Sequence, residues 1–150
     1  WDQMIIEALS NIESGVRLES SIDKERVTPD HIETLKDNEI FVFGTDIFGF
    51  HDGGASEQAV RQFGAVYGEK EGLHGQSYAI PTDGLPYALL RSYVFEFIEF
   101  AKAHPEKRFL VTRIGCGAAR YDASQIAPLF ERAIYVSNIV LPSDFWRFLM

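Results

Sequence analysis

The sequence has little of what several classes of protein require. Its 150 residues include one cysteine, Cys116, so no disulfide can form within the chain, and we expect a reducing, cytoplasmic environment. No apolar run approaches the ~20 residues of a membrane-spanning helix, and no signal-peptide pattern is present, so we expect no membrane partner. Lysines and arginines number 14 against 22 aspartates and glutamates, and the net charge of −8 argues against a broad nucleic-acid surface.

Metal ligands are also sparse. The four histidines, His31, His51, His74 and His104, show neither helical pairing nor the Cys/His spacing of a zinc site, so we expect no metal and no cofactor. Hydrophobic residues nevertheless make up 46 % of the chain and include twelve phenylalanines, a proportion typical of a well-packed globular domain.

Short apolar runs alternate with helical patterns, which predicts an α/β fold. The expected strands are 40–43, 77–80, 109–114 and 137–141, and the expected helices are 55–63, 86–103 and 122–133. An amphipathic helix over 1–14 and a polar linker come first, so we divide the chain into a helical extension, 1–34, and a domain, 35–150. The N-terminal helix either covers the sheet or packs on a second subunit, which would make a homo-oligomer.

Small residues follow the apolar strand at 109–114 and form a crowded loop, Gly115 to Ala119. Glycines let a backbone approach a ligand closely, and successive N–H groups of such a loop can hold an anion such as phosphate. A simple tight turn between a strand and a helix is the alternative interpretation.

A second loop of this kind, Gly44 to Gly54, joins the strand at 40–43 to the helix that begins near Ala55. The N-terminus of that helix favours negative charge, through its free N–H groups and the helix dipole. Since α/β sheets bind ligands at the carboxyl ends of their strands, we predict a crevice between Gly44–Ala55 and Gly115–Tyr121.

The motifs FVFGTD, HDGGA, SYAIPT and VTRIGCG together resemble the macro-domain superfamily, whose members bind ADP-ribose and related nucleotides. The resemblance covers about residues 35 to 142 and is closer to a macro-like group of bacteria and phages. The RIGCG loop is also similar to the branch that removes terminal ADP-ribose from acidic side chains. The resemblance implies a three-layer α/β/α fold in which a mixed sheet lies between helices.

The resemblance also implies roles for individual residues. Asp46 stands where the superfamily usually has an asparagine facing the distal ribose, and Tyr121 falls near an aromatic position that lines this ribose; a core tyrosine is the alternative. Gly53 to Ala55 match one diphosphate loop and Gly115 to Ala118 the other. The complete set of expected ligand-binding residues is Gly44, Thr45, Asp46, Gly53, Gly54, Ala55, Thr82, Arg113, Ile114, Gly115, Cys116, Gly117, Ala118 and Tyr121.

Two departures bear on catalysis. The hydrolase branch has a lysine and an aspartate where this chain has Asp83 and Ala119, and neither replacement can perform the same chemistry. A different catalytic set is Asp46, His51 and Asp52, in which a carboxylate orients water and the histidine moves a proton. Polar side chains that stabilise turns are the alternative reading of these three residues.

Three functions follow. The first is a module that binds ADP-ribose or a related nucleotide, such as mono- or poly-ADP-ribose or an NAD metabolite, free or attached to a macromolecule, without turnover. The second is an ADP-ribosyl glycohydrolase. The third is a structural or interaction protein whose pocket has degenerated.

Overall fold

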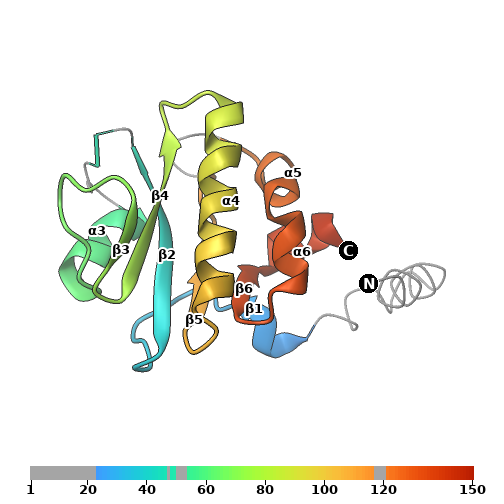
Figure 1. The fold of residues 1–150 in the computed structure, drawn as a ribbon, viewed down its shortest axis with the longest axis horizontal. Helices are drawn as coiled ribbons and strands as arrows, with labels where there is room; N and C mark the ends of the chain where they lie inside the picture. Colours follow the sequence, from blue (N-terminus) through green and yellow to red (C-terminus); the bar gives the residue numbers. More distant parts are fainter. Residues whose placement is uncertain (1–22, 47, 50–53, 117–120) are drawn as a thin grey trace.

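The fold is known from a computed structural model, which describes residues 23–46, 48–49, 54–116 and 121–150 (Figure 1). The predicted N-terminal helix over 1–14 lies outside these residues. Six strands form one sheet in the order β1-β6-β5-β2-β4-β3, and only the pair β3–β4 is antiparallel. The strands are β1 (Val27–Thr28), β2 (Glu39–Asp46), β3 (Gly72–His74), β4 (Ser77–Asp83), β5 (Arg108–Val111) and β6 (Ile139–Pro142).

Helices cover both faces of this mixed sheet and give the predicted three-layer α/β/α fold. The helices of the described ranges are α3 (Gly54–Gln62), α4 (Tyr87–Ala103), α5 (Ala123–Ile126) and α6 (Ser143–Leu149), with 3₁₀ segments η1 (Lys24–Arg26) and η2 (Ala127–Tyr135). Figure 1 shows α4 lying in front of the sheet. None of the helices described is long and apolar enough to cross a membrane.

Alternation along β2 divides the core between the two faces. Ile40 and Val42 belong to the larger apolar cluster, which includes residues of α4, α5, η2 and α6. Phe41 and Phe43 point the other way, into a smaller cluster with Ala59 of α3. Because β2 is buried on both faces, it has a continuous apolar run, as expected of a central strand in a parallel sheet.

The element boundaries differ from the expected ones at β5, which ends at Val111 rather than Ile114, at β6, which begins at Ile139 rather than Ser137, and at two prolines. The strand predicted to end at Ile80 continues through Pro81 to Asp83. Strand β3 pairs only with Ser77–Ala79, so Pro81 needs to pair on one side only, with β2, and its missing N–H is tolerated. The helix predicted over 122–133 changes from α5 to the 3₁₀ segment η2 just before Pro128, because proline removes an α-helical hydrogen bond.

The predicted linker contains an anchor of the sheet. Strand β1 pairs with β6, and Arg26 just before β1 makes five hydrogen bonds to backbone carbonyls. The Arg26 guanidinium lies 5.0 Å from the ring of Trp146, whose indole N–H donates to the Arg26 carbonyl at 2.8 Å. Burial lowers the pKa of Arg26, and the nearby Asp23 opposes this shift. The carbonyls that accept from Arg26 belong to Ala133, Ile134, Val136 and Ile139.

Candidate ligand-binding site

The two predicted glycine loops begin at the same edge of the sheet. Strand β2 lies between β5 and β4, and all three run parallel, so their carboxyl ends are neighbours. At this edge Asp46 of β2 stands opposite Asp83 of β4. The described parts of Gly44–Ala55 and Gly115–Tyr121 therefore flank one region.

Three of the expected ligand-binding residues at this edge are almost fully buried: Thr45, Thr82 and Ile114. Gly44 lies among them, because a Cβ at Gly44 would stand 2.7 Å from Thr82 Oγ1 and 3.6 Å from Ile114 Cβ. The Thr45 hydroxyl donates to the Lys70 carbonyl at 2.6 Å. These four residues pack closely together, and the contact with Thr82 of β4 leaves no room for a side chain at position 44.

The loop after β5 uses part of its own hydrogen-bonding capacity. The Ile114 N–H donates to the Thr112 carbonyl at 2.7 Å, and the Cys116 N–H donates to the Arg113 carbonyl at 3.2 Å. Gly115 has φ +76°, a conformation that favours glycine, and a Cβ there would lie 2.9 Å from the terminal Cδ1 of Ile126. The amide of Cys116, in the predicted anion cradle, is thus engaged within the loop, while Gly117 and Ala118 lie outside the described residues.

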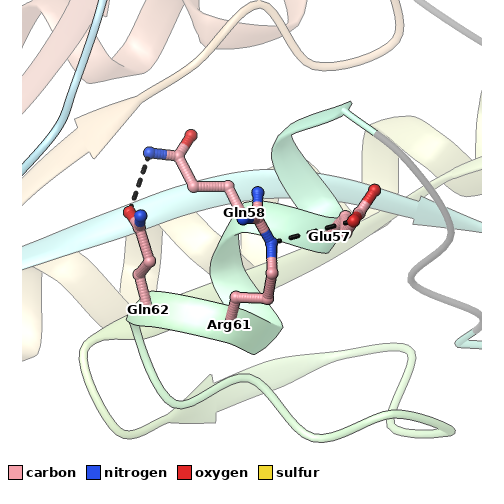
Figure 2. Close-up of polar contacts among 4 residues, drawn as sticks. All are labelled: Glu57, Gln58, Arg61 and Gln62. Carbon is pink, nitrogen blue, oxygen red and sulfur yellow. Dashed lines mark hydrogen bonds and ion pairs between the residues drawn. The ribbon is translucent and has the colours of Figure 1, made fainter.

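The start of α3 is the second element of the predicted phosphate site. Gly54 opens this nine-residue helix with φ +59°, and a Cβ there would meet no atom of the described residues within 4 Å. Glu57 in the first turn is paired with Arg61 at 3.7 Å, as Figure 2 shows. Among the described residues, Gly54 therefore has free space beside it, whereas Gly53 lies outside them.

A cavity of about 220 Å³ adjoins this helix end on the α3 face of the sheet. Ala55, from the first predicted loop, and Arg113, from the second, both line it. The Thr28 hydroxyl is buried and has no hydrogen-bond partner among the residues described. The other lining residues are Pro29, Asp30, His31, Ile32, Phe41, Gln58, Thr112 and Pro142, together with Thr28 itself.

The segment Thr28–Ile32 is the part of this cavity that the sequence analysis missed. Thr28 ends β1, which is only two residues long and has no periodicity to identify it, and the other four residues follow this strand. Gln58 holds the segment in place, because its side-chain amide donates to the Ile32 carbonyl at 2.5 Å and to Gln62 Oε1 at 3.2 Å (Figure 2). The sequence contains only a weak signal for this segment, a polar Thr-Pro-Asp sequence directly after a valine.

Arg113 lies at the mouth of the cavity between two carboxylates. Its guanidinium stands 3.3 Å from Asp144 and 3.6 Å from Asp30, and about half of its side chain is exposed. Cys116 is half-buried nearby, and burial raises the pKa of its thiol although Arg113 acts in the opposite direction. A thiol with a raised pKa is mostly protonated at neutral pH, so Cys116 is a poor nucleophile.

The residues proposed for catalysis are described only in part. The Asp46 carboxylate accepts the N–H of Phe48 at 2.9 Å, the local pattern of a turn-stabilising aspartate. His51 and Asp52 lie outside the described residues, as does Ala119. Within the described ranges, no group of three or more His, Cys, Asp or Glu side chains is arranged to hold a metal ion.

Tyr121 lies directly after the loop that follows β5. Its N–H donates to the Gly115 carbonyl at 2.8 Å, and its half-buried ring packs edge-on against Tyr87 at 6.1 Å between centroids. The Tyr87 hydroxyl donates to the Gln125 carbonyl at 2.6 Å, which fixes this exposed ring. Tyr121 and Tyr87 thus form an aromatic pair beside the loop after β5.

The chain matches no protein-family model, no curated protein and no solved structure. These comparisons therefore add nothing to the assignment of function. The site itself supplies a polar cavity, an open helix end, a glycine loop and an aromatic pair, all along the carboxyl edge of the sheet.

Proposed function

We propose that this protein binds ADP-ribose or a related nucleotide at the carboxyl edge of its sheet, without turnover. The observation that carries the proposal is that Ala55 and Arg113, predicted from two separate loops, line the same cavity. Crevices at the carboxyl ends of parallel strands are the usual ligand sites of α/β sheets. The motifs that resemble the macro-domain superfamily add the class of ligand.

The chemistry of the site suits the parts of such a ligand. The cavity has an aromatic and prolyl floor, Phe41 and Pro142, beside the unpartnered Thr28 hydroxyl, which suits a flat base with polar edges. The open N-terminus of α3 at Gly54 suits a diphosphate. Asp46 and Asp83 add negative charge nearby, so we expect modest affinity that depends on backbone amides and Arg113.

A charge placed at the helix end tests the proposal. We expect Gly54→Asn to keep most of the affinity for ADP-ribose measured by calorimetry, because asparagine tolerates positive φ. Gly54→Asp has nearly the same shape but adds a negative charge beside the diphosphate, and we expect affinity at least about tenfold lower. Equal affinities of the two folded variants would contradict the diphosphate assignment.

Two further measurements separate the alternatives. A thermal-shift panel of ADP-ribose, NAD and adenine nucleotides identifies the nucleotide, because ligands that bind the folded state raise the melting temperature. We expect no release of ADP-ribose from glutamate-linked substrate above the buffer rate, since Asp83 replaces the lysine of the related hydrolases. Release that is lost in Asp46→Ala would establish the hydrolase instead, and no binding to any nucleotide would favour an interaction protein.

A further inference from the structure

A concave region of about 320 Å³ lies between α4 and η2, on the face of the sheet opposite to the candidate ligand-binding site. Tyr87, Arg91 and Phe95 of α4 line it together with Arg132 of η2, and we refer to these four residues as the arginine groove. Glu131 also lines the region but contributes only one negative charge. The arginine groove is therefore cationic in a protein whose net charge is −8.

An aromatic ring, rather than a carboxylate, holds each arginine of the groove. The guanidinium carbons of Arg91 and Arg132 lie 5.1 Å and 4.7 Å from the centroid of the Phe95 ring. Within the described ranges, neither arginine has a carboxylate at ion-pair distance, whereas Arg61 and Arg113 do. The hydrogen-bond donors of both guanidiniums are thus placed to bind acidic side chains.

Apolar and aromatic side chains extend this surface along η2. Side chains three residues apart are eclipsed in a 3₁₀ helix, so Leu129, Arg132 and Tyr135 lie along one face of η2. Tyr135 is 42 % exposed at one end of this face, and Tyr87 of the arginine groove is 43 % exposed. Such a surface suits an amphipathic helix, which packs its apolar stripe into a groove and pairs its charges at the edges.

The segment 1–22, which precedes the described residues, is attached to the domain beside η2. It continues into η1, where Arg26 donates to two carbonyls at the C-terminal end of η2. The helix predicted over 1–14 would be about 21 Å long, and the nine residues of η2 extend over about 18 Å. Residues 15–22 span up to about 27 Å when extended. The segment is therefore long enough to place its helix along the arginine groove of its own chain.

The composition of segment 1–22 complements the arginine groove. Its four carboxylates and one arginine give it a net charge of −3. A short tether favours the same contact, because it raises the effective concentration of the segment to about the millimolar range. The apolar residues that lie at helical spacing in this segment are Met4, Ile5, Ala8, Leu9 and Ile12.

We infer that the helix over 1–14 docks in the arginine groove of its own chain. Its apolar stripe packs on Phe95 and Leu129, and its carboxylates pair with Arg91 and Arg132. This contact is independent of the proposed nucleotide binding, because the groove and the nucleotide cavity lie on opposite faces of the sheet.

Native-state hydrogen exchange on the full chain tests this contact. A free helix of this length is marginal in water, so strong protection of residues 1–14 requires a docked helix. We expect their amides to exchange about a hundredfold more slowly than in an unstructured chain. The variant Arg91→Glu/Arg132→Glu should reduce this protection to less than about tenfold. The control Arg61→Glu/Arg147→Glu makes the same change in net charge at exposed arginines elsewhere and should keep the protection.

A charge swap makes the test specific for these two surfaces. We expect Asp2→Lys/Glu7→Lys/Glu13→Lys to lose the protection when introduced alone, because the segment and the groove then repel each other. Combined with Arg91→Glu/Arg132→Glu, the same substitutions should restore most of it. The amides of β2 should stay protected in every variant, which would show that the fold is retained.

Three results would overturn the inference. The first is an unprotected segment in the unmodified chain. The second is protection that survives Arg91→Glu/Arg132→Glu, which would place the helix on another face, such as the sheet. The third is protection that grows with protein concentration between about 1 and 100 µM, together with dimers in sedimentation, which would place it on a second copy. The affinity for ADP-ribose should be equal in all these variants, so a failure of nucleotide binding would leave the inference standing.

Discussion

Arg26 and Arg113 both connect elements at the β1–β6 side of the sheet, but they do so with different partners. Arg26 is half-buried and donates to backbone carbonyls of η2 and β6, whose positions the fold dictates. Arg113 is half-exposed and faces the carboxylates of Asp30 and Asp144 at the mouth of a cavity. The backbone carbonyls that bind Arg26 are fixed by the fold and cannot exchange this arginine for water. The exposed carboxylates that face Arg113 can be hydrated instead. We therefore expect the first arginine to matter for the stability of the protein and the second for the proposed binding.

Removal of the Arg26 side chain should have the largest effect on stability. We expect Arg26→Ala to lower the free energy of unfolding by about 2–4 kcal/mol, because several carbonyls lose a charged donor and the Trp146 ring loses its cation. Denaturant titration measures this change. Arg26→Lys is the matched variant, and we expect it to recover only part of the loss, since an ammonium has fewer donors and no planar fork. A loss below about 0.5 kcal/mol for Arg26→Ala would mean that the carbonyls are hydrated instead.

Substitution of Arg113 should have a small effect on stability and a large effect on the affinity for the ligand. We expect Arg113→Gln to change the free energy of unfolding by less than about 1 kcal/mol, because exposed ion pairs contribute little. The affinity for ADP-ribose should fall about tenfold, since the cation at the mouth of the cavity is lost. Asp144→Asn sharpens the comparison: it releases Arg113 from one carboxylate, so calorimetry should show tighter binding. Unchanged affinity in both variants would place the ligand away from this cavity.

The smallest effect on stability is expected at the contact between the carboxyl groups of Glu71 and Glu96. Burial raises the pKa of Glu71 above its ordinary value of 4.5, and a hydrogen bond and charge repulsion from Glu96 act in the same direction. A raised pKa in the folded state stabilises the protein at low pH, and this contribution is lost as the pH rises above 4.5 and through the folded-state pKa. We expect Glu71→Gln to flatten that decline and to stabilise the protein slightly at neutral pH. Unfolding titrations at about pH 4 and about pH 7 would show it, and a parallel pH profile in the two proteins would contradict it.

The sequence allowed the central layer of the fold to be predicted well and its margins poorly. Strand β2 and helix α4 have enough apolar residues in sequence to reveal a period or a continuous run. Strand β1 is only two residues long and pairs with β6, so that Val27 stands beside Leu141, and helix α6 is also short. Long-range pairing of this kind leaves no local pattern.

The candidate site likewise has parts that could be predicted from the sequence and parts that could not. The glycine loops were visible because glycine marks positions of positive φ, as at Gly54 and Gly115. The cavity wall at Thr28–Ile32 was not visible, because its role follows from the pairing of β1 with β6. The interpretation of Gly44 as a ligand-facing residue also missed the Thr82 side chain, which occupies the space beside it. Neighbours across a sheet decide whether a glycine serves a ligand or the core.

The pairing of β1 with β6 has a consequence for the order in which the chain acquires its structure. Val27 stands beside Leu141 in the sheet, so β1 has no strand partner until nearly the whole domain has been synthesised. At a translation rate of roughly 5–20 residues per second, Val27 waits on the order of ten seconds for that partner. The β2–β4–β5 centre has its partners earlier, so we expect folding to proceed outward from it. The hydrogen bond between Trp146 and the Arg26 carbonyl would then form late in folding, because it requires Trp146 to have left the ribosome.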